Sequence, residues 1–293
     1  MHIRMIPFSI LLVLLMISSV NAEVYKYGAD DTVIGSIKKH TTKNKESLIE
    51  IARKYDIGYN EISDSNPYLD AFVPGDDVTV IVPTSWVLPN LPSYQGIVIN
   101  LSEMRLYYFF RKHKTNFVKT FPIGIGTEGN DTPEGIFSVI EKTIRPSWHV
   151  PESIREEDPD LPSIVPPGPD NPLGSHAIRL SLPTILIHGT NRPYGIGRRV
   201  SHGCIRLYPE DIPKLFKLVS TGAKVTIVRQ PIKIGKENKN VYIEVHNDKS
   251  LELDYFNEAV KLLQQKHLLK DINTEKFYWA LTEKRGIPIN ISD

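Results

Sequence analysis

The chain has 293 residues, of which 41% are hydrophobic and 24% are charged, and its formal net charge is +1. These are ordinary values for globular proteins, and the length allows one large domain with smaller ones. A net charge so close to zero argues against a nucleic-acid partner held by phosphate neutralisation.

The first 22 residues predict an export signal. Arg4 gives a short positive region, residues 5–17 are almost entirely apolar, and small residues follow up to Ala22. The apolar run is shorter than the roughly 20 residues of a spanning helix. We therefore expect residues 1–22 to be a signal peptide, with an uncleaved N-terminal anchor as the alternative.

Residues 33–83 predict a small α+β module. Residues 33–37 and 78–82 are strand-like. Residues 47–55 carry apolar side chains at helical spacing, and a second helical stretch, 59–65, ends near a proline. About 50 residues bury little core on their own. Residues 85–96 are interpreted as a proline-containing linker.

This module resembles a LysM carbohydrate-binding module. The matching segments are 47–52, 55–62, Asn66-Pro67, Pro74-Gly75 and 80–83. The resemblance implies binding to the N-acetylhexosamine glycan of cell walls. The usual Gly-Asp opening is Lys45-Glu46 here, and Glu is a weaker helix N-cap than Asp. A packing module without a ligand is the alternative.

Residues 97–230 predict a β-dominated domain. Only 211–219 is expected to be helical, with Asp211 as a possible N-cap and Pro213 in the first turn. The predicted strands are 97–100, 106–110, 117–121, 135–142, 177–180, 185–187 and 224–228. Residues 231–293 predict a C-terminal extension with a strand at 241–245 and helices at 255–269 and 274–284. We interpret this extension as a cap packed on the preceding domain.

The single cysteine, Cys204, lies in the segment Ser201-His202-Gly203-Cys204-Ile205-Arg206. A lone thiol in an exported chain cannot form an internal disulfide, so a reactive role is the best interpretation. The nucleophile is the thiolate, and an adjacent imidazole that takes the proton is the simplest activation. His188 follows the apolar strand 185–187, and the turn-rich run 191–197 can bring it back beside the thiol. Its second ring nitrogen needs an acceptor, for which a backbone carbonyl near Gly189-Thr190 is a candidate.

The residues around the thiol predict an anion-binding turn. Backbone N–H groups of Ser201, His202, Gly203 and Cys204 can stabilise a developing oxyanion, and Gly203 permits unusual dihedrals. Arg206, two positions beyond the thiol, can hold a substrate carboxylate.

Other residues near the thiol are candidate ligands for a carboxylate or for zinc. Arg198 and Arg199 are either further carboxylate ligands or solvated loop charges. His188, His202 and Cys204 are zinc-ligand types, but their spacing matches no common zinc site, so no metal is expected.

The segment strongly resembles the L,D-transpeptidase (YkuD-like) family. The signature is His188-Gly189-Thr190 at a strand end, followed by Ser-His-Gly-Cys-x-Arg at 201–206. The likeness continues through residues 122–126, 132–137, 145–148 and 166–174. The order of LysM-like module, catalytic domain and C-terminal extension is similar to the periplasmic ErfK/YbiS-like branch of Gram-negative bacteria.

This resemblance implies a β-sandwich-like catalytic domain with Cys204 as nucleophile and His188 as general base and acid. It implies a substrate site that includes Ser201, His202, Gly203, Arg206, Gly189 and Thr190. The implied reaction releases D-alanine from a donor tetrapeptide stem of peptidoglycan. The acyl group then passes to diaminopimelate, which gives a crosslink, or to a lipoprotein lysine, which anchors that protein. No cofactor is required, carbapenems should inhibit, and the location should be the periplasm. The alternatives are an L,D-carboxypeptidase and a non-catalytic peptidoglycan-binding protein.

Overall fold

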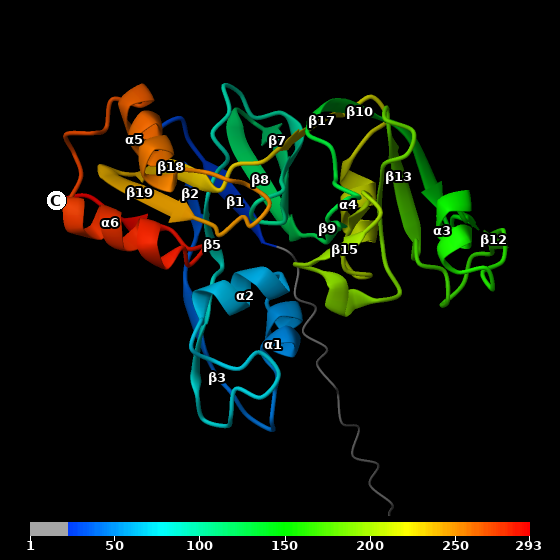
Figure 1. The fold of residues 1–293 in the computed structure, drawn as a ribbon. Coiled ribbons are helices and arrows are strands. Elements are labelled where there is room, and N and C mark those ends of the chain that lie inside the picture. The colour runs from blue at the N-terminus through cyan, green and yellow to red at the C-terminus, as the bar shows by residue number, and fades with distance from the viewer. Residues whose placement is uncertain (1–22) are drawn as a thin grey trace, which may run out of the picture.

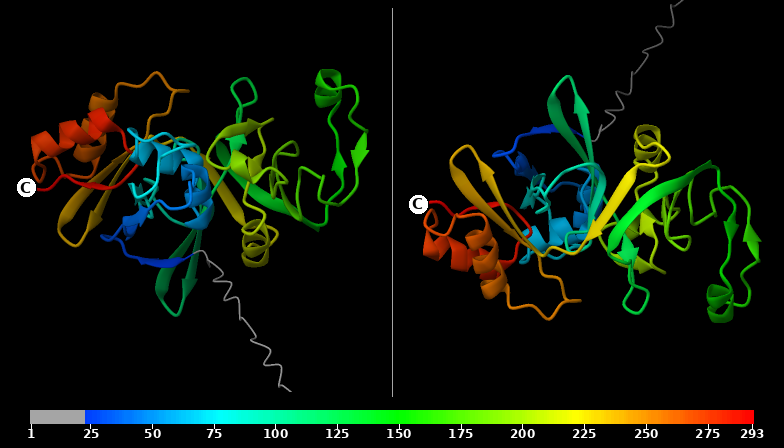
Figure 2. Two further views of the ribbon diagram at one scale, coloured as in Figure 1. Left: turned by 90° about the horizontal axis from the view of Figure 1, so that it is seen from below. Right: turned by 90° about the horizontal axis from the view of Figure 1, so that it is seen from above.

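The computed structural model describes residues 23–293, so the predicted signal peptide at 1–22 lies outside the described residues. Every helix within 23–293 is too short or too polar to cross a membrane. Strands dominate, as the sequence predicts. Figure 1 shows a central sheet with the two C-terminal helices on one side and a small projecting segment on the other, and Figure 2 gives two further views.

The largest element is a nine-stranded mixed sheet. Its strands, in spatial order, are β1 (Val24–Tyr27), β8 (Thr115–Pro122), β7 (Arg105–Lys112), β6 (Gly96–Asn100), β17 (Lys224–Val228), β10 (Gly135–Ile144), β13 (His176–Leu180), β14 (Leu186–His188) and β16 (Ile205–Arg206). Helix α4 (Ile212–Leu218) packs on it, with Leu215 fully buried in the main core. Asp211 occupies the N-cap position but makes no side-chain cap; its carboxylate accepts a hydrogen bond from Lys214.

Two features of the N-terminal region differ from the prediction. Strand β1 precedes the module yet pairs antiparallel with β8, so the chain enters the catalytic sheet before it forms the module. The predicted strand at 33–37 ends at Gly35 as β2 (Val33–Gly35), and a separate strand that was not predicted, β3 (Lys38–Thr41), follows it. Gly35 makes this break at φ +76°, where a Cβ would lie 2.1 Å from the Thr84 carbonyl oxygen. The predicted linker is also wrong at its start, because β5 (Ser85–Val87) pairs with β2.

The module itself has the predicted strand–helix–helix–strand order. Strand β3 pairs with β4 (Thr79–Val82), and helices α1 (Leu48–Lys54) and α2 (Tyr59–Ser65) lie between them. The N-cap of α1 is Ser47, which forms a capping box with Glu50. The expectation that Glu46 caps this helix is wrong, since its carboxylate lies 2.8 Å from His40 Nε2 instead.

A buried ion pair joins the module to the central sheet. Arg105 of β7 donates to both carboxylate oxygens of Glu61 on α2, each at 2.8 Å, and both side chains are almost fully buried. The Trp86 indole donates to the same carboxylate at 2.8 Å. Removing either partner would leave a buried charge uncompensated, so the module is fixed to the sheet.

The C-terminal extension is a three-stranded antiparallel sheet, β18 (Ile232–Glu237), β19 (Asn240–Val245) and β20 (Ile289–Asn290), covered by α5 (Tyr255–Gln265) and α6 (Thr274–Glu283). Strands β18 and β20 were not predicted, and α5 ends four residues earlier than expected.

The extension contacts both other regions through one buried cluster. Lys233 Nζ lies 2.6 Å from Glu103 Oε2 and 2.9 Å from Glu244 Oε1. Glu244 also accepts a hydrogen bond from the Val87 backbone at 2.5 Å. The extension is therefore more than a cap on the catalytic domain.

Candidate active site

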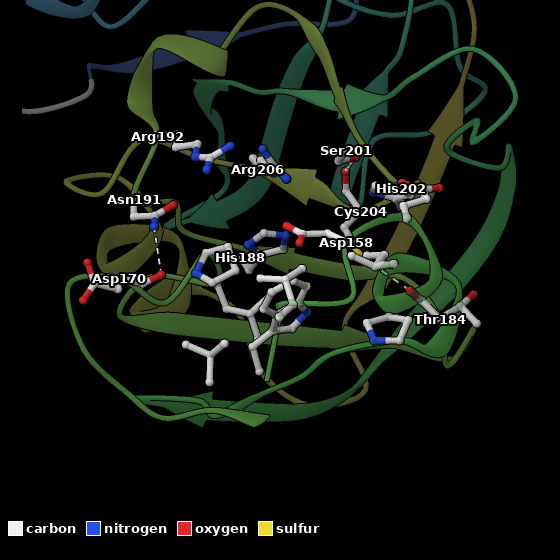
Figure 3. Close-up of a pocket in the computed structure, with 18 residues that line it drawn as sticks. Asp158, Asp170, Thr184, His188, Asn191, Arg192, Ser201, His202, Cys204 and Arg206 are labelled. Atoms are coloured by element: carbon white, nitrogen blue, oxygen red, sulfur yellow. Dashed lines mark hydrogen bonds and ion pairs between the residues drawn. The ribbon is translucent and has the colours of Figure 1, made fainter. Parts of the chain in front are cut away.

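Cys204, His188 and Arg206 line one cavity of about 390 Å³ at the end of the sheet (Figure 3). Strands β14 and β16 run parallel, with Ile187 opposite Ile205 and His188 opposite Arg206. Residues in register point to the same face of a sheet, and so do residues two apart on one strand. The imidazole and the guanidinium therefore share one face, and Cys204, which directly precedes β16, lines the same cavity. Cys204 directly precedes Ile205, the register partner of Ile187, so the thiol lies beside the strand that ends in His188.

The hydrogen bonds of His188 fix its tautomer. The side chain is buried, and its Nδ1 lies 2.6 Å from the Gly189 carbonyl oxygen. Because a carbonyl can only accept, Nδ1 carries the proton and Nε2 keeps its lone pair. The structure thus supplies the backbone acceptor that the sequence suggested. Burial, followed by the charge of Arg206, lowers the His188 pKa to about 4.

Cys204 rests as a thiol. Its Sγ lies 3.6 Å from the Thr184 carbonyl oxygen. Burial raises the pKa of the thiol above its ordinary value, although a backbone hydrogen bond at Leu186 and the charge of Arg206 oppose the shift. With the imidazole neutral as well, the proton must move during attack rather than before it. This arrangement suits general-base catalysis better than a preformed ion pair.

The turn from Ser201 to Cys204 presents free backbone donors. Gly203 adopts φ +93°, as expected of a glycine required for its dihedrals. Within residues 23–293, the N–H groups of His202, Gly203 and Cys204 donate to no other protein group. Ser201 has a role that the sequence did not suggest, because its hydroxyl donates to the Cys204 carbonyl at 2.5 Å. The His202 side chain lines the cavity, with its Nε2 3.4 Å from a carboxylate oxygen of Glu157.

Two arginines mark one side of the cavity. Arg192 and Arg206 lie side by side in Figure 3, and the charge of Arg192 together with burial lowers the Arg206 pKa. In the described part of the chain, Arg206 Nε has no hydrogen-bond partner. An unpaired buried guanidinium is suited to a carboxylate ligand. Arg192 was missed because a lone arginine in a turn carries no sequence signal.

Several predicted site residues lie outside this cavity. The guanidinium of Arg198 stacks 3.8 Å from the centre of the Tyr59 ring, and Arg199 binds Asp131. Both are structural contacts, so the carboxylate-ligand interpretation of Arg198 and Arg199 is not supported. Gly189 and Thr190 lie behind His188 rather than in the cavity lining: a Cβ on Gly189 would lie 3.0 Å from Ile212, and Thr190 Oγ1 accepts from the Arg192 backbone at 2.9 Å.

A projecting segment forms the outer wall of the cavity. It consists of β11 (Trp148–His149), α3 (Glu152–Glu157) and β12 (Ile164–Val165), with β11 and β12 paired. Apolar side chains and the acidic pair Glu157 and Asp158 face the cavity. Helix α3 was not predicted, since none of its residues is buried and it has no apolar periodicity.

Comparison with known proteins identifies the family. Residues 94–227 match the family model of the L,D-transpeptidase catalytic domain, YkuD. The chain is 41% identical over 236 residues to the probable L,D-transpeptidase YcfS of Escherichia coli K12, covering 77% of this chain and 73% of that protein. The chain belongs to the L,D-transpeptidase family. Another relative of this L,D-transpeptidase is the probable L,D-transpeptidase ErfK/SrfK of Salmonella typhimurium, 37% identical over 262 residues and covering 85% of this chain and 84% of that one.

Among solved structures, this L,D-transpeptidase is similar to the catalytic domain of the Enterococcus faecium L,D-transpeptidase. The TM-score is 0.36 at 21% identity, covering 47% of this chain and 99% of that one. The predicted family, its ErfK/YbiS-like branch and the β-dominated fold class are confirmed. The protein is a peptidoglycan L,D-transpeptidase.

Proposed function

We propose that this L,D-transpeptidase transfers the acyl group of a donor tetrapeptide stem through a thioester on Cys204. Cys204 Sγ attacks the carbonyl carbon that follows diaminopimelate, and His188 Nε2 takes the thiol proton. The tetrahedral oxyanion lies against the free amides of the 201–204 turn. The intermediate collapses with cleavage of the C–N bond. His188 then donates its proton to the departing D-alanine amine.

The second half of the reaction reverses these roles. An acceptor amine attacks the thioester carbonyl and His188 removes a proton from the amine. The C–S bond then breaks, and the departing Cys204 thiolate takes that proton from His188. The observation that carries the proposal is the cavity that Cys204 and His188 line together, with His188 Nδ1 bound to the Gly189 carbonyl so that Nε2 is unprotonated. Arg206 and Arg192 are the proposed ligands of a stem carboxylate.

The acidic residues of the projecting segment favour an amine over water as the acceptor. Glu157 and Asp158 line the cavity on the projecting segment and can attract an ammonium group before it is deprotonated. The side chains of diaminopimelate and lysine both carry such a group. We propose either a stem diaminopimelate or a lipoprotein lysine as acceptor, and hydrolysis as the side reaction when neither is present.

The test is incubation of the purified protein with tetrapeptide muropeptides, with and without an amine-bearing acceptor stem. Mass spectrometry should detect D-alanine release and, with acceptor, a crosslinked product. Cys204→Ala and His188→Asn should abolish both, while His113→Asn, at an exposed position, serves as control. D-alanine release that persists in Cys204→Ala would overturn the proposal. Release without transfer at any acceptor concentration would assign a carboxypeptidase instead.

Three further properties rest on the sequence resemblance and remain proposals. A carbapenem should acylate Cys204, which is visible as a mass increase absent from Cys204→Ala. The protein should fractionate with the periplasm. The LysM-like module should bind wall glycan, and the exposed apolar side chains of Tyr68, Phe72 and Val73 on its α2–β4 loop offer a surface for sugar rings. A pull-down with insoluble peptidoglycan that retains as much Tyr68→Ala/Phe72→Ala variant as native protein would count against that surface.

A further inference from the structure

The catalytic turn is held by its carbonyl oxygens. Ser201 O accepts from the Thr127 backbone N–H at 2.8 Å and from the Thr127 hydroxyl at 3.2 Å. Gly203 O accepts from the Thr132 hydroxyl at 2.9 Å, and Cys204 O accepts from the Ser201 hydroxyl at 2.5 Å. These anchors hold the backbone of the turn through its carbonyl groups, while the amides of His202 and Cys204 remain free.

Thr132 is the most informative of these anchors because its hydrogen bonds have only one possible direction. Its side chain is buried, and its Oγ1 lies 3.0 Å from the Gly126 backbone nitrogen. That amide can only donate, and the Gly203 carbonyl can only accept. The single hydroxyl proton of Thr132 therefore goes to Gly203 O.

The conformation of the loop between Gly126 and Pro133 fixes the position of Thr132. A Cβ on Gly126 would lie 2.0 Å from the Asn130 carbonyl oxygen and 2.8 Å from the Thr132 nitrogen, so only glycine allows the loop to fold back this closely. Pro133 restricts the preceding backbone to extended conformations. Thr132 lines a separate cleft and not the cavity that holds Cys204, so it reaches the turn from behind.

The planarity of the peptide bond converts this contact into an effect on the reaction. In a trans peptide, the C=O of one residue and the N–H of the next point in opposite directions. Because the Gly203 carbonyl points toward Thr132, the Cys204 N–H points in the opposite direction within the same peptide plane, away from the rear cleft. We propose that Thr132 is a positioning residue that aims the Cys204 amide at the oxyanion of the tetrahedral intermediate.

This inference rests on the proposed acyl transfer, and it predicts a selective defect. Thr132→Val keeps the shape but removes both hydrogen bonds. Loss of one oxyanion donor costs about 100- to 1000-fold in kcat, so a misdirected amide should cost roughly 10- to 100-fold, with KM little changed. Thr132→Ser keeps the hydroxyl and should restore most of the activity. Thr143→Val, on β10, is the matched control.

The decisive readout compares two reactions of the same sulfur. Acylation by a muropeptide or a carbapenem passes through an oxyanion, whereas alkylation by iodoacetamide displaces iodide at carbon and does not. Thr132→Val should slow acylation while alkylation stays within about twofold of the native rate, since the thiol itself is untouched. Urea unfolding of each variant sets conditions in which all are folded, because Thr132→Val leaves the buried Gly126 amide unpaired and lowers stability.

Three results would overturn the inference: native acylation by Thr132→Val, a parallel loss of acylation and alkylation, or no recovery in Thr132→Ser. None of them touches the proposed function, which is tested separately by D-alanine release from Cys204→Ala and by transfer to an acceptor amine.

Discussion

A neutral, buried His188 should make stability depend on pH in a way that can be measured. Burial and the charge of Arg206 hold its pKa at about 4 in the folded protein, against 6.5 for the ordinary imidazole. Between these two values the unfolded chain binds more protons than the folded one, so the free energy of unfolding decreases as pH falls. One pKa unit is worth about 1.4 kcal/mol, so the displacement corresponds to about 3 kcal/mol once both states are protonated.

The assay is urea unfolding at about pH 7.5 and about pH 4.5 of the native protein, His188→Asn and His113→Asn. Asparagine can still donate to the Gly189 carbonyl but does not titrate. When the pH is lowered, the free energy of unfolding of the native protein should fall by about 2 to 3 kcal/mol more than that of His188→Asn, and the His113→Asn control should behave as native. Equal losses in the native protein and His188→Asn would refute the reasoning. A smaller loss of unfolding free energy in the native protein than in His188→Asn would mean that His188 is protonated in the folded protein.

Two further predictions concern charged residues in and behind the site. Arg206→Gln should raise the His188 pKa, because the Arg206 charge lowers it, and should reduce kcat/KM roughly 10- to 100-fold through loss of a charge-assisted contact to substrate. An unchanged His188 titration by NMR would contradict this. Lys233→Met should destabilise the protein by about 3–5 kcal/mol in urea unfolding, because Glu103 and Glu244 remain buried and keep only His246 as a cationic neighbour. Lys270→Met, at an exposed position, is the control, and a similar effect there would exclude a specific role for the cluster.

The sequence predicts those parts of the site that depend on the order of residues close together in the chain. His188 ends an apolar strand, and the segment from there to Ser201 is rich in turn residues. Cys204 and Arg206 are two positions apart, a spacing that predicts the same face of a strand. These features suffice to expect the shared cavity. The sequence does not contain the parallel pairing of β14 with β16, which fixes the register and hence which side chains meet. The sequence analysis expected the Ser201 amide to contribute, whereas in the structure the Ser201 hydroxyl donates to the Cys204 carbonyl.

The parts that could not be predicted depend on contacts between distant segments. Strand β1 has only four residues, and it is a strand because β8 offers an edge about ninety positions later. Helix α3 has no buried residue, so the apolar spacing that revealed α1 and α4 is missing there. Arg192 and Thr132 are single residues in loops, and their roles follow only from what lies opposite them.

The N-terminal module and the catalytic turn are linked through one loop. The first amides of α2, on Tyr59 and Asn60, donate to the carbonyls of Ile196 and Gly197 at 3.1 and 3.3 Å. A Cβ on Gly197 would lie 2.2 Å from the Tyr59 nitrogen, so glycine is required for this approach. This loop leads directly into β15 (Arg199–Ser201), which pairs with β9 (Ile125–Gly126).

The contacts of α2 bear on where the catalytic unit begins. The family model starts at residue 94, but a chain cut there would lose Glu61 and Trp86, so Arg105 would lose its carboxylate partner and the ring that covers it. It would also lose the α2 amides that hold residues 196–197, four positions before the turn whose carbonyls Thr127 and Thr132 fix from the other side. In this protein the module therefore supports the geometry of the active site whether or not it binds glycan.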